Sequence, residues 1–310
     1  KTRRPQFRLF PGYIRLFPGY SVFFRVLSTV QSEKNLTDFT YSVMIFCVGN
    51  TRRMTEMGQD LQQYEVSDAP GSRWITMSNA LTRAGHGLTL AEKRIVMCAV
   101  SKLDSRRVLP PGEVPTTRIT AAEYAETFGV DPNTAYEALQ DGAKHLYQRS
   151  IQFYEPAFKR NGKPIEPTLV TMRWVGQVHY QKKEGWVELY WWPKLLPSLT
   201  GIKKQFTTYQ LQQASALRSV YSWKLLELLM RFKDSGHAQY TIEDFCASME
   251  ATEKQRSDFN NIRRRMIEPA IKELQEKDGW LIQWMPIKAG RKVAAVRFDF
   301  MRSPQGRLDV

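Results

Sequence analysis

The chain of 310 residues lacks the residue pairs that metal-binding and disulfide-linked proteins need. Its three cysteines, Cys47, Cys98 and Cys246, are far apart and odd in number, which argues against a disulfide framework and favours a reducing compartment. The four histidines are isolated, and neither a His-x-His nor a Cys-x-x-Cys pair occurs, so the ligand spacing of a zinc site is missing. We therefore expect no metal and no cofactor.

Two further absences concern enzymes and membranes. No G-x-x-x-x-G-K-[ST] motif occurs, so the sequence has no phosphate-binding loop for a nucleotide, and no pair of acidic residues is placed for acid–base catalysis. The longest apolar run, residues 41–49, is shorter than the about 20 residues of a membrane span. We expect a soluble cytosolic protein that is not an enzyme and has no membrane partner.

Positive charge is what the chain has in excess. Lys and Arg number 45 against 31 Asp and Glu, which gives a net charge of +14. Such an excess describes the partner rather than the fold, and nucleic acid is the first candidate. The length predicts about two domains.

Residues 1–73 show no sustained period of 2 or 3.6 residues, and we expect them to be a poorly ordered leader. The leader carries one seven-residue unit written twice, "RLFPGYIRLFPGYS", from Arg8 to Ser21. Each copy holds a Pro-Gly pair, which ends helices, so the repeat is not a coiled coil in spite of its length.

From residue 74 onward one order of predicted elements occurs twice. The first copy has a helix over 88–104 with Thr89 as N-cap, a short strand, a helix over Ala121–Phe128, and a helix over 132–147 that starts at Asp131 and Pro132. A strand over 151–154 follows, and then two strands, over 168–181 and 185–192, joined as a hairpin.

The second copy repeats this order after a junction at 199–206. It has a long amphipathic helix over 216–236, a strand and short helix in "AQYTIEDFCASME", a helix that begins after Asp258, and two strands joined at 288–292. Tyr124 and Phe245 occupy matching positions. This is the winged-helix order, and we predict an α+β fold of two tandem winged-helix domains related by internal duplication, over 74–200 and 201–310.

The segment "NNIRRRM", residues 260–266, is the strongest functional signal. Arginine can donate two hydrogen bonds to guanine and asparagine can pair in the same way with adenine, while further arginines contact phosphates. The segment lies early in a second helix, where a helix-turn-helix reads bases. The alternative is a solvated basic face. The candidate DNA-binding residues are Asn260, Asn261, Arg263, Arg264 and Arg265.

We expect Asn261, Arg264 and Arg265 to project opposite to the apolar face of this helix, with Arg263 nearer to its edge. Pro269 has no N–H and should kink the helix one turn after the arginines. The predicted apolar face consists of Phe259, Ile262, Met266, Ala270, Ile271 and Leu274.

Two weaker candidates are the turn of the last hairpin and the second helix of the first copy. The turn "IKAGRK" carries Lys288, Arg291 and Lys292, which can contact phosphates, although basic hairpin turns are common. In the helix, Glu137 and Asp141 weaken the positive field, so light DNA reading and protein contact both stay open. The outward-facing candidates of that helix are Asn133, Gln140 and Lys144.

The hairpin of the first copy is rich in aromatic residues, which we assign to wing and core. A stacking platform for single-stranded nucleic acid is the alternative. The residues concerned are Trp174, Trp186, Tyr190, Trp191 and Trp192.

Six segments in this order resemble the theta-type (iteron-binding) plasmid replication initiators, the Rep family of paired winged helices that includes the F plasmid initiator. The resemblance covers residues 78–301. The segments are "SNAL" leading into "LTLAEKRIV", "AAEYAETFGVDPNTAYEALQDGAKHL" before "IQFY", "KKQFTTYQLQQ", "SVYSWKLLELL", "FNNIRRRMIEPAIKEL" and "KAGRKVAAVRFDF".

The resemblance implies a function and partners. The C-terminal domain would read repeated duplex sites (iterons) at an origin through Arg263, Arg264 and Arg265, and the N-terminal domain would contact the adjacent half-site or mediate dimerisation. Monomers would initiate replication and dimers would repress the protein's own promoter. The implied partners are iteron DNA, a second copy of the chain, and host replication proteins such as helicase and initiator. We expect self-association through the first domain and its helix from Thr89.

The leader repeat then has an interpretation at the level of DNA. Seven codons are 21 nucleotides, close to two turns of B-DNA at about 10.5 bp each. Residues 8–21 would be translated iteron DNA, and the natural start would be a later methionine such as Met54, Met57 or Met77. An ordinary duplicated turn peptide is the alternative.

Two other functions stay open from the residues alone. One is a transcriptional regulator that uses the same two winged helices without a role in replication. The other is a single-strand or RNA-binding module based on the Trp-rich hairpin.

Overall fold

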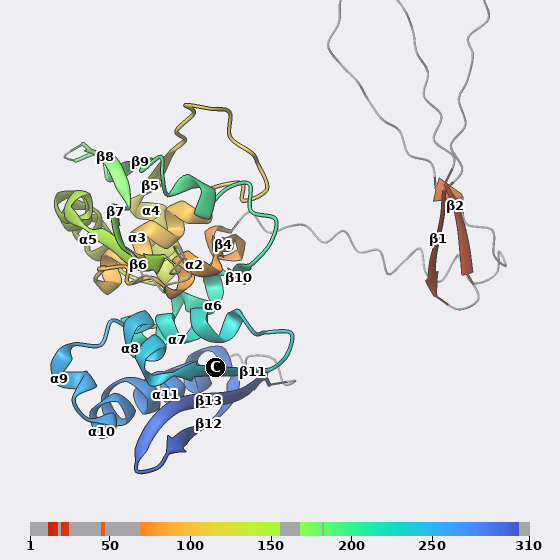
Figure 1. Cartoon of the computed structure of the whole chain (residues 1–310). Coiled ribbons are helices and arrows are strands. Elements are labelled where there is room, and N and C mark those ends of the chain that lie inside the picture. The colour runs from red at the N-terminus through yellow and green to blue at the C-terminus, as the bar shows by residue number, and fades with distance from the viewer. Residues whose placement is uncertain are drawn as a thin grey trace, which may run out of the picture. The chain divides into compact units, whose positions relative to one another are not determined.

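In the computed structural model (Figure 1) the chain divides into two compact units, residues 1–65 and residues 66–310, which are described separately. The structure describes residues 12–17, 20–24, 45–46, 69–155, 168–181 and 183–303. Of the three candidate start methionines, Met54 and Met57 lie outside these residues.

The described part of the first unit is a three-stranded antiparallel sheet in the order β1-β2-β3. Its strands are β1 (Gly12–Phe17), β2 (Tyr20–Phe24) and β3 (Ile45–Phe46). The sequence repeat supplies β1 and the beginning of β2. The poorly ordered leader that we expected falls mostly outside the described residues, and within them the prediction missed these strands.

We also placed the end of the leader, at residue 73, too late in the chain. Pro70 is buried, and Leu211 donates its N–H to the carbonyl of Arg73 at 2.9 Å. Residues 70–73 therefore belong to the packed second unit. They begin with a short 3-10 helix, η1 (Pro70–Ser72).

An N-terminal winged helix follows, made of helices packed with the antiparallel sheet β5-β9-β8. Its elements are β4 (Trp74–Ser78), α2 (Asn79–Arg83), α3 (Leu90–Val100), β5 (Thr116–Thr120), α4 (Ala121–Phe128), α5 (Pro132–His145), η2 (Leu146–Gln148), β6 (Ser150–Glu155), β7 (Thr168–Arg173), β8 (Val175–Tyr180), β9 (Trp186–Trp191) and η3 (Leu196–Ser198). The predicted caps are confirmed: Thr89 and Glu92 form a capping box on α3, and the side chain of Asp131 accepts the N–H of Asn133.

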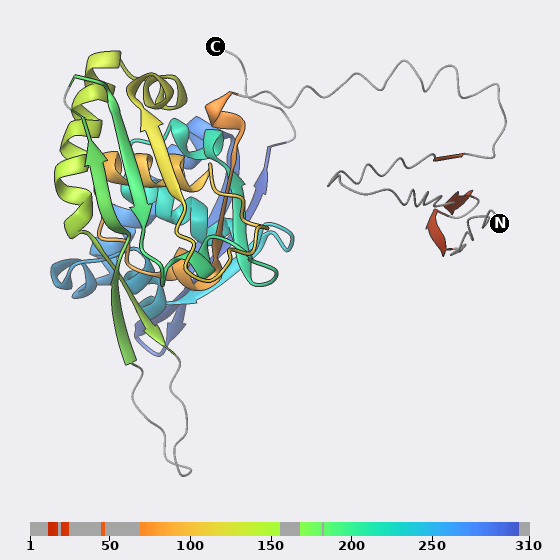
Figure 2. The ribbon, with the colours of Figure 1, turned by 90° about the horizontal axis from the view of Figure 1, so that it is seen from above.

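The strand that we predicted over 168–181 is two strands in different sheets. β7 pairs with β6 in a separate ribbon, which Figure 2 shows leaving the body of the molecule, while β8 pairs with β9. The change occurs at Trp174, whose indole is fully buried and donates to the carbonyl of His86 at 2.9 Å. Burial of this ring turns the chain from one sheet into the other.

A C-terminal winged helix has the sheet β11-β13-β12. Its elements are β10 (Phe206–Gln210), α6 (Leu211–Ser215), α7 (Val220–Met230), β11 (His237–Thr241), α8 (Ile242–Ser248), α9 (Glu253–Arg256), α10 (Phe259–Ile262), the π-helical turn η4 (Arg263–Ile267), α11 (Glu268–Asp278), β12 (Trp280–Ala289) and β13 (Lys292–Arg302). The helix predicted over 216–236 is shorter, since α7 is capped by Ser219 and ends at Met230.

The two winged helices share one topology. Each has a first helix (α3, α7), an edge strand (β5, β11), a short helix (α4, α8), a longer helical segment and a β-hairpin whose second strand lies in the middle of the sheet. Tyr124 and Phe245, which we matched from sequence, are both buried at the same point of α4 and α8. The ribbon β6–β7 is an addition of the first copy.

A short ribbon joins the two copies. β4 and β10, which precede equivalent helices, pair antiparallel from Trp74↔Gln210 to Phe206↔Ser78. Ile75, Met77 and Tyr209 lie on its buried face.

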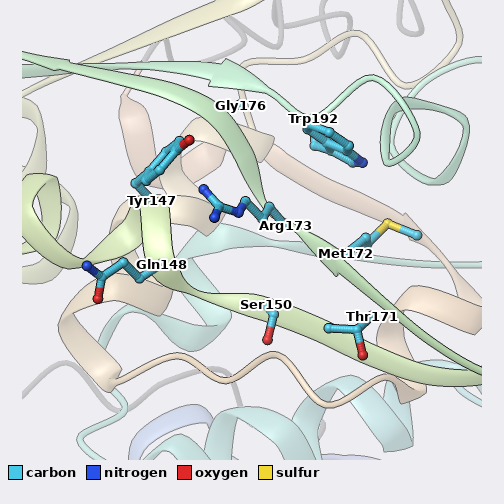
Figure 3. Close-up of a pocket in the computed structure, with 8 residues that line it drawn as sticks. All are labelled: Tyr147, Gln148, Ser150, Thr171, Met172, Arg173, Gly176 and Trp192. Carbon is cyan, nitrogen blue, oxygen red and sulfur yellow. The ribbon is translucent and has the colours of Figure 1, made fainter.

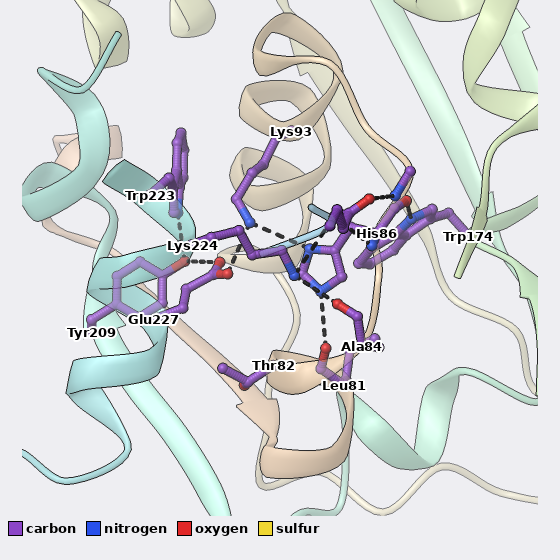
Figure 4. A network of polar contacts seen from close by, with 12 residues as sticks. Leu81, Thr82, Ala84, His86, Lys93, Trp174, Tyr209, Trp223, Lys224 and Glu227 are labelled. Carbon is purple, nitrogen blue, oxygen red and sulfur yellow. Dashed lines mark hydrogen bonds and ion pairs between the residues drawn. The ribbon is translucent and has the colours of Figure 1, made fainter. Parts of the chain in front are cut away.

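A buried polar network lies behind this ribbon (Figure 4). The ammonium of Lys93 in α3 lies 2.9 Å from Oε2 of Glu227 in α7 and 3.3 Å from Nδ1 of His86. The other oxygen of Glu227 accepts the hydroxyl of Tyr209, and the ammonium of Lys224 donates to the carbonyl of Ala84 at 2.7 Å. The first helices of the two copies are therefore joined by an ion pair whose side chains are both fully buried.

Burial in the network lowers the pKa of two of its members, His86 and Lys224. Burial, with the nearby Lys224 and Lys93, holds the pKa of His86 well below its usual value, so the ring is neutral and donates from Nε2 to the carbonyl of Leu81. Burial also lowers the pKa of Lys224 to about 7, with Lys93 acting in the same direction.

The helix after Thr89 is not a free surface. Every residue of α3 from Glu92 to Val100 is buried, although the sequence predicted a single apolar stripe. The expectation that this helix mediates self-association is therefore wrong, because its faces are occupied by the rest of the fold.

Among the described residues no helix is both long and apolar enough to cross a membrane. The same part of the chain contains no cluster of three or more His, Cys, Asp or Glu side chains that could hold a metal ion.

Candidate nucleic-acid interface

The helix-turn-helix of the C-terminal copy is built by consecutive caps. Glu250 after α8 has a positive φ of 56°, which turns the chain toward α9. Thr252 and Gln255 form a capping box on α9, and Asp258 caps α10 through the N–H of Asn260. These caps end one short helix and start the next within a few residues, and so place the segment 259–278 across the domain.

The predicted faces of this segment are found in the structure. Ile262, Met266 and Leu274 have no exposed surface, and Ala270 and Ile271 are also buried, while Phe259 is half-buried against Trp284. Arg263, Arg264 and Arg265 are all exposed. The three arginines thus stand on the solvent side of a well-packed element.

The asparagines next to the arginines differ from each other. Asn260 is exposed, whereas Asn261 is half-buried and its amide donates to the carbonyl of Lys254 at 3.4 Å. Lys254 is exposed on α9 and was not among the predicted residues. In the sequence, its positive charge shortly before the predicted helix start at Asp258 was the one sign that Lys254 could belong to the site.

Arg264 and Arg265 have no acidic partner within the described part of the chain. Arg263 does have one: its Nε lies 3.5 Å from the carboxylate of Glu268, and both side chains are about half exposed. The guanidiniums of Arg264 and Arg265 therefore keep their hydrogen-bond donors for an external acceptor.

Pro269 is accommodated by a change of helix type rather than by a simple break. The N–H of Glu268 bonds to the carbonyl of Arg263, five residues back, and the five residues 263–267 form a π-helical turn. α11 then continues to Asp278 and ends at Gly279, which has a φ of 66°. The predicted disturbance is present, but it lies on the arginines themselves and not one turn after them.

The wing of the C-terminal copy is the hairpin β12–β13. Its last pair is Ala289↔Lys292, and Gly290 has a φ of 63°, which the tight turn requires. Lys288, Arg291 and Lys292 are exposed at this tip as predicted, and no ion pair within the described residues neutralises them.

In the N-terminal copy, helix α5 corresponds to the arginine-bearing segment. Asn133 and Lys144 are exposed, and Gln140 is half-buried. The ammonium of Lys144 lies 3.0 Å from Asp141, and Glu137 is also exposed on this helix. The positive potential of α5 is therefore weaker than that of residues 263–265.

The aromatic hairpin of the N-terminal copy is mainly core. Trp174 and Trp191 are buried, and the guanidinium of Arg118 lies 4.1 Å from the ring centre of Trp186. Trp192 is 37% exposed. The extended stacking platform that we considered is not formed, because most of its rings are covered.

Trp192 does line an open pocket of about 460 Å³ beside the ribbon β6–β7 (Figure 3). Tyr147 and Arg173 stand opposite, with the guanidinium 4.2 Å from the ring centre. The remaining lining residues are Gln148, Ser150, Thr171, Met172 and Gly176. None of the predicted DNA-binding residues lines this pocket.

Comparison with known protein families gives two matches in tandem. Residues 74–230 match the family described as Initiator Replication protein, WH1, and residues 241–300 match Initiator Rep protein, WH2. The first match runs to Met230 and includes β10, α6 and α7. The division of the chain at 200/201 stays a prediction.

Two individual proteins of Escherichia coli are similar to most of this chain. The chain is 26% identical over 228 residues to an uncharacterized 27.6 kDa protein of Escherichia coli, covering 70% of this chain and 91% of that protein. It is 26% identical over 255 residues to the PI protein of Escherichia coli, covering 73% and 82% respectively.

Among solved structures, the Pi initiator protein in complex with iteron DNA has the same fold. The TM-score is 0.61 at 21% sequence identity, over 76% of this chain and 99% of that chain. Two winged helices of one topology, in tandem and matched across more than half of the chain, identify the protein as a member of the initiator replication protein family.

Proposed function

We propose that the chain initiates plasmid replication by binding repeated duplex DNA sites, the iterons, in the bacterial cytoplasm, and that it represses its own promoter. The observation that carries this proposal is the row Arg263–Arg265. It is exposed on the second helix of a helix-turn-helix and lies in a domain that matches initiator proteins. The Pi initiator protein, which shares this fold, was solved with iteron DNA, and that supports duplex DNA as the ligand here.

The proposal gives each group of the C-terminal copy a task. Arg264 and Arg265 donate to guanine edges in the major groove, and Asn260 and Asn261 bond adenine. Arg263, whose guanidinium lies beside the carboxylate of Glu268, contacts the phosphate backbone of the DNA. Lys288, Arg291 and Lys292 hold the wing on phosphates, which adds affinity without sequence information.

The N-terminal copy, proposed as residues 74–200, has a lighter share of the DNA. Asn133, Gln140 and Lys144 contact the neighbouring half-site, and the acidic groups on α5 keep this contact weak. We also propose that this copy mediates self-association and contacts host replication proteins such as helicase and initiator. The surface involved is not α3, which is buried.

The protein acts by binding in this proposal, not by catalysis. Opening of the origin follows from the free energy of several bound copies and from recruited host proteins. The proposed DNA-reading residues stand on helical segments and a β-hairpin, which suits a binding function.

Selection of DNA from a random duplex library by the full chain tests the proposal. We expect enrichment of one motif, bound by a monomer on a single site, with a preference of about 10³-fold or more over scrambled duplex. The mass of the complex gives the stoichiometry. Failure to enrich any motif, or a stronger preference for single strands, would contradict the proposed function.

A further inference from the structure

On the packed face of the arginine-bearing segment, the spacing of the buried residues is one residue longer than an α-helix allows. Ile262, Met266 and Ile267 all have no exposed surface. In an α-helix, successive residues are about 100° apart, so Ile267 would point about 140° away from Ile262 and would leave the core. Burial of both Met266 and Ile267 under Ile262 therefore requires a wider turn, which is the π-helical turn that the structure has.

The same geometry decides where Arg265 points. Three residues after Ile262, an α-helix would place Arg265 about 60° from the buried direction. With hydrogen bonds five residues apart the turn holds about 4.4 residues, and Arg265 then points about 115° away from Ile262. Met266 and Ile267 come to lie about 33° and 49° on either side of the buried direction by the same estimate.

Pro269 favours this wider turn. In an α-helix its ring would collide with the carbonyl of Arg265, four residues back, and the bond to that carbonyl would be missing in any case. The widening of the helix just before Pro269 relieves the collision. The bond from Glu268 to Arg263 is the last one before the proline, so the helix returns to α-helical spacing at the point where no donor exists.

We propose that the π-helical turn Arg263–Ile267 is a positioning element for DNA recognition: it turns Arg265 out of the packed face, so that three consecutive guanidiniums are presented together, and Pro269 maintains it. This inference rests on the proposed function. It adds to it that the spacing of the arginines, and not only their number, determines which duplex is preferred.

The three arginines offer a well-matched test. Deletion of one of them leaves Ile-Arg-Arg-Met-Ile, in which the apolar residues recur at i, i+3 and i+4, the pattern of an uninterrupted α-helix. The deletion is made together with Pro269→Ala, so that no proline disturbs the new helix. Arg264→Ala with Pro269 retained is the control: it also has two arginines and the same charge, but keeps the length of the turn and the proline that maintains it.

The measurement is the ratio of Kd values for scrambled duplex and for the duplex that wild type selects from a random library, at one salt concentration. We expect this ratio to be at least tenfold lower for the deletion variant than for its control. The two variants should bind scrambled duplex with equal affinity, and the Tm of the deletion variant should equal or exceed that of the control. If the turn had a purely structural role, the two variants would differ in Tm and would have the same ratio of Kd values.

Each result has one reading. Equal preference in the deletion variant and its control overturns the proposal. Full preference in the single variant Pro269→Ala overturns the role of Pro269, since packing of Met266 and Ile267 then suffices to hold the turn. A wild-type chain that selects no duplex refutes the proposed function instead, and is seen before any variant is made.

Discussion

At the scale of single residues, charges occupy two very different environments: Arg264 and Arg265 face solvent, whereas Lys93 and Glu227 join the two copies as a fully buried ion pair. Arg264 and Arg265 followed from local spacing, because the apolar neighbours of one helix determine which side faces solvent. Lys93 and Glu227 were not predicted to pair, since each lies in an apolar helix and the partners are 134 residues apart. Only the tertiary fold brings them together.

Lys224 gives the first prediction at this scale. Its pKa is about 7 in the folded chain against 10.5 when exposed, so between these values the unfolded chain binds more protons and the stability of wild type rises with pH. Lys224→Met removes this contribution. The free energy of unfolding of the variant minus that of wild type should therefore fall from pH 7 to 10, by at most about 1.4 kcal/mol per pH unit.

Urea unfolding at several pH values measures this difference. Lys272→Met is the control, because Lys272 is 75% exposed on α11 and its replacement removes the same charge without touching a buried site. Parallel curves for wild type and Lys224→Met would show that Lys224 stays charged in the folded protein.

The buried pair gives a second prediction. Lys93→Met leaves the carboxylate of Glu227 buried, with the hydroxyl of Tyr209 as its one remaining hydrogen-bond donor among the residues that the structure describes. Loss of one partner of a buried pair costs about 3–5 kcal/mol, so the midpoint of urea unfolding should fall strongly. Addition of Glu227→Gln, which removes the stranded charge, should recover part of the loss; no recovery would mean that the ion pair is not what stabilises this site.

At the scale of elements, the starts of helices were predictable and the breaks inside elements were not. Asp131 with Pro132, and Thr89, marked two helix starts by local chemistry alone. The break at Trp174 depends on a hydrogen bond to His86, 88 residues away, which no local pattern reveals. The π-helical turn had a signal, the adjacent pair Met266 and Ile267 before Pro269, which shifts the apolar stripe by one residue.

The C-terminal wing gives the prediction at this scale. Lys288→Ala and Lys292→Ala should weaken binding to selected and scrambled duplex alike, because phosphate contacts carry no sequence information. Each should also reduce the slope of log Kd against log salt by about 1. Titrations at three or more salt concentrations measure this, with Lys272→Ala on α11 as the charge-matched control. A loss confined to the selected duplex would mean that the wing reads bases.

At the scale of the whole molecule, the duplication was visible in the sequence but the contact between the copies was not. Element order and length predicted two winged helices, and the sheets confirm this by their common strand order. The pairing of β4 with β10 was missed because the two strands are short and more than a hundred residues apart. This pairing disfavours Met77 among the three candidate starts, because a chain that begins there lacks most of β4.

A chain that begins at Met57 should keep the stability and DNA affinity of the full chain, whereas one that begins at Met77 should lose stability. The second chain lacks Trp74, Ile75 and Thr76, which form three of the five pairs of the ribbon. Ile75 is fully buried, and the loss of such a side chain costs about 2–5 kcal/mol. Thermal unfolding compares the two; equal Tm values would show that β4 is dispensable.

The central claim is that arginines of the C-terminal copy read bases of duplex DNA. The most direct test is the Kd of wild type, Arg264→Ala and Arg265→Ala for the selected duplex and for every single base-pair change in it, at one salt concentration. Each variant should lose about 1–3 kcal/mol on the selected duplex and should lose its preference at only one or two base pairs. Uniform weakening on every duplex, with the pattern of preferences unchanged, would contradict the account.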